Sequence, residues 1–76
     1  MRLAVVEWLD SCADTGWQGK HILEATSPSK CVSVGMVVET DSCIKVFQSK
    51  SDTGNVDNIM TIPRCSVKRI RYLKIK

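Results

Sequence analysis

The tripeptide Asp-Thr-Gly occurs twice in this chain, at residues 14–16 and 52–54. Two such loops could place two carboxylates around one shared proton, the arrangement with which aspartic proteases activate water. The preceding residues, Cys12-Ala13 and Lys50-Ser51, are unlike the apolar strand residues that bury protease aspartates. A chain of 76 residues also cannot build two lobes around a substrate cleft. We therefore interpret both triplets as polar turns in which Asp bonds the local backbone and Gly takes a positive φ.

The sequence also lacks the residue combinations that other kinds of catalysis need. His21 is the only histidine, so a nucleophilic serine or cysteine has little choice of base. The glycines are dispersed and form no phosphate-binding loop. The four cysteines have no closely spaced pair of the kind that binds zinc, being Cys12, Cys31, Cys43 and Cys65. We expect no enzyme, no cofactor and no metal, and four reduced thiols.

Charge is distributed unevenly along the chain. The net charge is +3, yet residues 64–76 hold six basic residues and no acid. On a final strand, this cluster would attract phosphates in a salt-dependent way, through Lys68, Arg69, Arg71 and Lys74. Tyr72 or Trp17 could add base stacking. The other interpretation is a solvated edge that keeps the last strand from pairing with other chains.

Length and composition indicate one small domain over residues 1–76. Apolar residues make up 43% of the chain and charged residues 25%, as in ordinary globular domains. The longest apolar stretch, residues 34–38, is too short to span a bilayer. The N-terminal residues meet an acid at Glu7 and lack the apolar region of a signal peptide. We expect a soluble protein of the cytoplasm with no membrane association.

Alternating apolar residues predict four strands, at residues 2–9, 31–40, 43–48 and 59–62. The second and third form a hairpin around Asp41-Ser42. In the second strand we expect the inward side chains to be Val32, Val34, Met36 and Val38. In the third strand we expect Ile44 and Val46 to share one face.

The remaining segments are polar or ambiguous. Residues 10–16 and 26–30 predict loops, and residues 17–25 suit an irregular strand or a short helix over 22–25. Residues 49–58 predict a ten-residue polar loop. After Pro63, a stripe of Val67, Ile70 and Leu73 would suit a helix. We prefer a 3₁₀ turn over residues 64–66 followed by a last strand through Ile70 and Tyr72.

The order of these segments resembles a five-stranded SH3-like small β-barrel. Short strings also resemble small uncharacterised proteins of tailed bacteriophages, namely Trp8-Leu9-Asp10-Ser11, Gly16-Trp17, Ser33-Val34-Gly35, Gln48-Ser49 and Thr61-Ile62-Pro63-Arg64. The resemblance implies an accessory protein that acts in the cytoplasm of a bacterial host, and it brings no catalytic residues. The chain lacks the paired aromatics and acidic first loop typical of SH3 domains that read proline-rich peptides.

We therefore expect a non-enzymatic phage accessory protein that binds and blocks a host macromolecule or a small signalling nucleotide. The expected binding residues lie in the two triplet loops and beside them, at Asp14, Trp17, Ser49, Asp52 and Arg64. The alternative is an SH3-like or Sm-like nucleic-acid-binding module that uses the basic last strand. A minor virion component is a third interpretation. We also expect a homo-oligomer, in the form of a two-fold dimer.

The sequence allows two interpretations of Trp17. Its ring could close one end of the barrel, or it could stand exposed as an anchor for a partner, since interface hot spots favour Trp and Arg.

Overall fold

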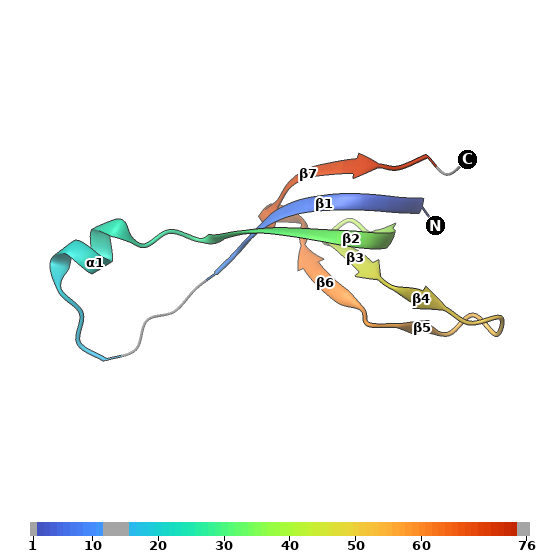
Figure 1. Ribbon diagram of the computed structural model, residues 1–76, viewed down its shortest axis with the longest axis horizontal. Helices are drawn as coiled ribbons and strands as arrows, with labels where there is room; N and C mark the ends of the chain where they lie inside the picture. The colour runs from blue at the N-terminus through green and yellow to red at the C-terminus, as the bar shows by residue number, and fades with distance from the viewer. Residues whose placement is uncertain (1, 12–15, 75–76) are drawn as a thin grey trace.

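The computed structural model describes residues 2–11 and 16–74. Its elements are β1 (Arg2–Asp10), α1 (Lys20–Ala25), β2 (Ser29–Glu39), β3 (Cys43–Phe47), β4 (Ser49–Lys50), β5 (Val56–Asp57), β6 (Met60–Pro63), the 3₁₀ turn η1 (Arg64–Ser66) and β7 (Val67–Tyr72) (Figure 1). These elements confirm a mainly β chain with a 3₁₀ turn before the last strand and one short helix.

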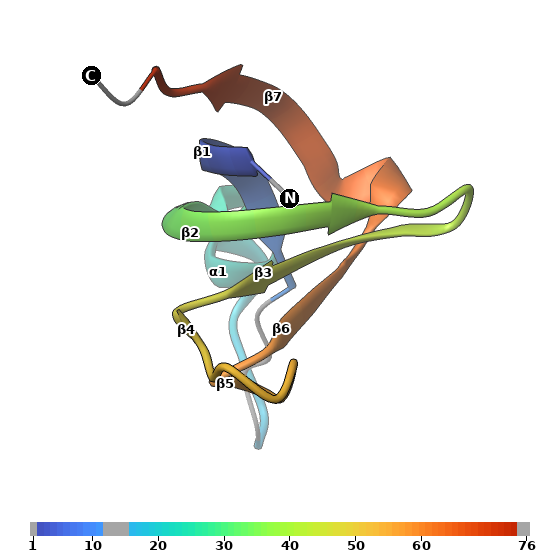
Figure 2. The same ribbon diagram turned by 90° about the vertical axis from the view of Figure 1, so that its right-hand side faces the viewer.

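Five strands form one antiparallel sheet in the order β6-β3-β2-β1-β7. The sheet is curved, with β6 and β7 at its edges, and η1 joins these two edges directly (Figure 2). The pairing of β1 with β2 is the longest and runs from Arg2↔Val37 to Asp10↔Ser29. We call these two strands the central ribbon, and β3 and β7 pair with its two sides.

The core lies on the concave inner face of the sheet. Six buried apolar residues form one cluster there, namely Ala4, Val6, Val37, Ile44, Val46 and Ile62. Four half-buried residues pack against that cluster, and they are Trp8, Val67, Ile70 and Tyr72. Because side chains alternate along a strand, every second residue of β1 and β2 faces inward and the others face outward. The expectation that Ile44 and Val46 share one face is confirmed.

The predicted inward face of β2 is wrong. Val37 is only 4% exposed, whereas Val34 is 49% exposed and Val32 is 65% exposed. The cause is the register of β1, in which Ala4 pairs with Gly35 and Val5 with Val34. Since Ala4 and Val6 point inward, the residues opposite them must point inward as well. A one-residue change of register exchanges the two faces of a strand.

Gly35 is the point at which β2 meets the end of β3 most closely. A Cβ built on Gly35 would lie 2.7 Å from the carbonyl oxygen of Phe47 and 2.9 Å from Cγ1 of Val46. Nε2 of Gln48 lies nearby and donates to the carbonyl oxygen of Val34 at 2.8 Å. A side chain at position 35 would therefore push β3 away from β2.

The opposite side of the sheet, which we call the outer face, carries the other set of alternating side chains. On β1 and β2 these are Leu3, Val5, Glu7, Leu9, Val32, Val34, Met36 and Val38. On β3 and β7 they are Lys45, Phe47, Arg69 and Arg71. Phe47 is buried but lies outside the inner core cluster, as expected for an outward residue. Both faces of the central ribbon are thus apolar.

Residues 49–58 are not the unstructured loop that their polarity predicts. They contain a small hairpin, with Ser49↔Asp57 and Lys50↔Val56 as paired residues. Near its tip, the Ser51 amide donates to the carbonyl oxygen of Asn55 at 2.7 Å. Gly54 has a φ of +91°, which glycine adopts without strain. The second Asp-Thr-Gly triplet is therefore a turn, as the sequence predicts.

A cluster of polar side chains joins the C-terminal end of β2 to β7 and η1. The Tyr72 hydroxyl donates to Oε2 of Glu39, and Nη2 of Arg64 lies 3.4 Å from Oε1 of the same carboxylate. The guanidinium of Arg2 stacks over the Tyr72 ring, 3.9 Å from its centroid. This Glu39 cluster ties an edge strand to the end of the central ribbon.

The chain is elongated rather than compact. Its radius of gyration is 16.0 Å, against about 11 Å for a compact domain of this length. The cause is the connection between β1 and β2, of which we call residues 16–28 the arm. The arm carries α1 well away from the sheet (Figure 1), and no residue of α1 is buried. No helix in the described residues is long and apolar enough to cross a bilayer.

Substituting the two faces of β2 tests this corrected assignment. Val37→Asp should unfold the domain, because an unpaired charge in the core costs several kcal/mol, comparable with the whole stability of a domain this small. Val34→Asp should leave the fold intact, because that side chain faces outward. Circular dichroism with thermal melting of both variants distinguishes the faces, and a folded Val37→Asp protein would contradict the assignment.

The Glu39 cluster should be visible in an alkaline titration. The hydrogen bond to Glu39, together with partial burial, raises the pKa of Tyr72 above its ordinary value of 10.0. Since the folded pKa is the higher one, this stabilisation is complete below about pH 10 and is lost as pH rises through the folded pKa. Tyr72 is the only tyrosine, so phenolate absorbance reports it alone. In Glu39→Gln the midpoint should move down; an unchanged midpoint would refute the contact.

Candidate functional site

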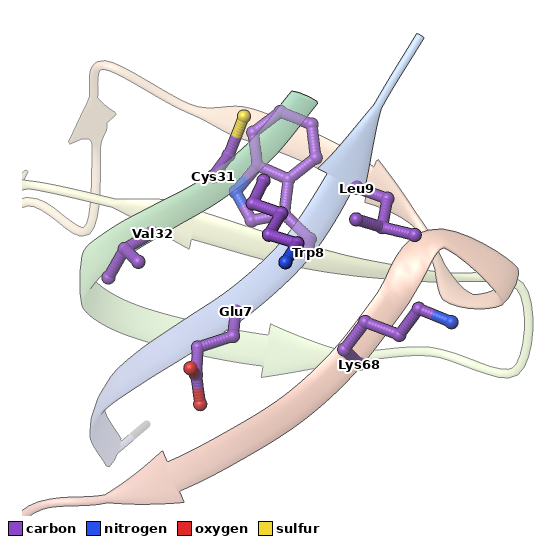
Figure 3. Close-up of a pocket in the computed structure, with 7 residues that line it drawn as sticks. Glu7, Trp8, Leu9, Cys31, Val32 and Lys68 are labelled. Carbon is purple, nitrogen blue, oxygen red and sulfur yellow. The ribbon is translucent and has the colours of Figure 1, made fainter. Parts of the chain in front are cut away.

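A pocket of about 280 Å³ lies at the end of the sheet from which the arm departs. Its walls come from three strands, β1, β2 and β7 (Figure 3). The lining residues of this arm-base pocket are Glu7, Trp8, Leu9, Lys30, Cys31, Val32 and Lys68. Most of the lining is apolar, and the charged groups belong to one acid and two lysines. Such a pocket suits an apolar group that carries or adjoins negative charge.

A β-bulge shapes the arm-base pocket on the β7 side. Glu7 pairs with Arg69 and Trp8 pairs with Val67, so the register passes over Lys68. A bulge inserts one extra residue and redirects a side chain. Here it brings Lys68 to the pocket wall while Val67 still packs on the core.

The carboxylate of Glu7 is held by two arginines. Nε of Arg69 and Nε of Arg71 each lie 4.0 Å from Oε2 of Glu7. Lys30 and Lys68 have no acidic partner among the described residues. The side chains of Glu7 and Lys68 point away from each other (Figure 3). The pocket surroundings are therefore net positive.

Trp8 packs against the core, and its indole N–H forms a hydrogen bond within the domain. Its Nε1 donates to Oγ of Ser33 at 3.0 Å, and that hydroxyl lies 3.6 Å from Sδ of Met60, which accepts from it. The indole N–H is thus already used within the domain, on the side of the sheet that carries the core.

A second pocket, of about 380 Å³, lies beside the small hairpin on the other part of the outer face. Its lining residues are Val38, Lys45, Phe47, Lys50, Gly54, Val56 and Ile59. This hairpin pocket is also apolar with two lysines. Between it and the arm-base pocket lie Val5 and Val34, which pair with each other across β1 and β2.

The arm presents apolar side chains that no other described part of the chain covers. Trp17 is fully exposed, and Leu23 on α1 is 76% exposed. The interpretation of Trp17 as a plug of the barrel end is therefore wrong, and the exposed alternative is right. A tryptophan loses a large favourable burial term when it stays in water.

The expected loop site is not assembled as one surface. Asp14 lies outside the described residues. Trp17 lies on the arm, whereas Ser49 and Asp52 lie on the small hairpin at the opposite end of the molecule (Figure 1). Sequence reasoning joined the two triplets because they are alike, but the fold separates them.

Arg64 has structural partners. Its Nε and Nη2 donate to the carbonyl oxygen of Thr40 at 3.1 and 2.9 Å, and Nη2 also pairs with Glu39. Its backbone N–H donates to the carbonyl oxygen of Ser42 at 3.0 Å. Arg64 therefore fixes η1 against the β2–β3 turn, and its Nε and Nη2 are engaged within the domain.

The basic residues of the C-terminal segment divide between two places. Lys68, Arg69 and Arg71 lie on the outer side of β7, near the arm-base pocket. Lys74 follows the end of β7, at the end of the molecule away from the arm (Figure 1). The sequence predicted the first three as binding residues, but it did not predict Lys30, Lys45 or the outward valines as part of the site. The inverted face of β2 explains this, because it assigned those valines to the core.

The described residues contain no group of three His, Cys, Asp or Glu side chains arranged to hold a metal ion. Cys31, Cys43 and Cys65 are unpaired thiols, and His21 is exposed on α1. Comparison with protein-family models, curated proteins and solved structures found no match to this chain. The geometry therefore carries the functional argument by itself.

The structural role of Arg64 can be separated from a binding role. Arg64→Ala should lower the free energy of unfolding by about 1–2 kcal/mol, because it removes two hydrogen bonds to a carbonyl oxygen. Arg69→Ala is the matched control and should change it by less than about 0.5 kcal/mol, as for other exposed ion pairs. Urea denaturation measures both. Equal stabilities of the two variants would assign Arg64 no structural role.

Proposed function

We propose that this chain is a non-catalytic binding protein that grips a protein partner with the arm. The observation that carries the proposal is the full exposure of Trp17 on a segment that projects from the sheet. Leu23 adds a second exposed apolar side chain on the same segment. Tryptophan is among the residues most enriched in interface hot spots, so an exposed one on a projecting arm suits a protein interface.

A nucleic-acid partner fits this arrangement less well. Binding of single strands combines a basic groove with aromatic rings on which bases stack. Trp17 lies on the arm, away from the basic residues of β7 (Figure 1), and Trp8 is half-buried against the core. We therefore favour a protein partner over the nucleic-acid alternative.

The order of the strands supports an SH3-like small barrel as the fold of this binding protein. β1 pairs with both β2 and β7, the strands β1, β2, β3 and β6 follow one another in antiparallel pairs, and η1 precedes the last strand. We propose, from the sequence resemblance, that the protein is a phage accessory factor that blocks a bacterial host protein in the cytoplasm.

Capture from bacterial cells tests the arm. A photo-crosslinking amino acid at position 17 should join the tagged protein to a host protein in nuclease-treated lysate. The same amino acid at position 41, an exposed site in the turn between β2 and β3, is the control and should not. Leu23→Ser should weaken the crosslink at position 17 by about tenfold. Absence of a crosslinked protein, or a product that forms only in lysate without nuclease, would overturn the proposal.

A further inference from the structure

On β1 and β2 the outer face is an apolar sheet surface that the described chain leaves partly exposed, whereas Phe47 of β3 is buried. Val32 and Val34 are 65% and 49% exposed, and Val38 is 39% exposed. Antiparallel sheets that face water on one side normally alternate apolar and polar residues. Here the outward residues of the central ribbon are mainly apolar, although the inward residues Ala4, Val6 and Val37 already belong to the core. The outer set is therefore available to a partner.

Positive charge borders this apolar surface on both long sides. On the β7 side lie Lys68, Arg69 and Arg71, and on the β3 side lie Lys45 and Lys50. Glu7 is the acid among the outward residues of the described strands, and it is held between Arg69 and Arg71. The surface as a whole is an apolar stripe with cationic borders.

This pattern of charge selects among the occupants that could cover the stripe. A second copy of the chain would bring the same cationic borders against each other, and like charges at an interface are unfavourable. A nucleic acid would satisfy the cations but offer no apolar group to the valines. An acidic segment with an apolar side matches both features at once.

We propose that the outer face docks an acidic amphipathic segment of a partner protein. The apolar side chains of the segment lie along Val5, Val32 and Val34, and its carboxylates face the bordering lysines and arginines. The arm-base pocket and the hairpin pocket, of about 280 and 380 Å³, lie at the two ends of the stripe and receive one larger apolar side chain each. This goes beyond the grip by the arm, because different residues form the surface.

Selection from a random peptide library tests the proposal, since it requires only the chain itself as bait. The tagged full chain is presented to yeast-displayed peptides, and enriched peptides are synthesised and titrated by fluorescence anisotropy. We expect enriched sequences to combine Asp or Glu with Leu, Ile or Phe, and their affinity to fall as salt rises. No enrichment, or enrichment of basic peptides, would overturn the proposal.

Three variants locate the binding of enriched peptides. Val34→Asp and Lys45→Glu should each weaken it by about tenfold or more, through the stripe and through its border. Lys20→Glu makes the same charge change on the arm, 85% exposed at its side chain, and should leave affinity unchanged. Circular dichroism confirms that each variant is folded. Equal affinities in all three variants would contradict docking on the outer face.

Three further probes test the other molecules that could cover the outer face. These are vesicles containing anionic phosphatidylglycerol, a single-stranded oligonucleotide, and the protein itself, measured by light scattering over a range of concentrations. If any of these associates more tightly than the acidic peptides and loses its association in Val34→Asp, the proposed occupant is wrong. If no acidic peptide binds while the crosslink at position 17 forms, the outer-face proposal is rejected and the arm proposal stands.

Discussion

β2 carries apolar side chains on both of its faces, and the chain covers only one of them. The register with β1 directs Gly35 and Val37 inward, where they meet Ala4, Val46 and the rest of the core. The opposite register would have placed the larger outward valines in the core and left no room for β3 near position 35. The inward set of β2 is therefore the smaller one, with Gly35 where the backbone of β3 comes close. The same register leaves the larger apolar set outside.

The two ends of the inner face are closed by different chemistry. At one end, the Glu39 cluster joins β2 to β7 and η1 with charged and aromatic groups. At the other end, Trp8, Ser33 and Met60 form a short hydrogen-bonded series below the base of the arm. Neither closure uses a residue of the outer face or of the arm. Substitutions on those two surfaces are therefore separable from folding, which is unusual in so small a domain.

The sequence predicts the positions of the elements better than their orientation. Alternation and turn residues give the strands near 2–9, 31–40 and 43–48, and the residues after Pro63 give the 3₁₀ turn. Alternation selects the wrong face of β2, because the more apolar set of its residues points outward, the inward set includes Ser33 and Gly35, and the partner register is not local. It also cannot place the two Asp-Thr-Gly triplets in space, since their separation depends on the whole ribbon between them.

The candidate site, too, could be predicted from the sequence only in part. The basic residues of β7 are evident from composition, whereas Lys30 and Lys45 join them only through the folding of three strands. The small hairpin at residues 49–58 was hidden by its polarity, because its pairing consists of backbone bonds that need no apolar side chain. Glu7 could have indicated the outward face of β1, because a single acid in an apolar strand usually points to water.

A domain of this size reaches a useful affinity most readily by combining separate surfaces. The β1–β2 ribbon runs from the outer face to the base of the arm, so one element of the fold adjoins both surfaces (Figure 1). A partner that touches the outer face is then held close to Trp17, and the second contact forms at a high effective concentration. Two shallow sites can in this way replace the deep cleft that 76 residues cannot build. The elongated shape, in which the arm projects from the sheet, is what keeps the two proposed contacts apart on one small chain.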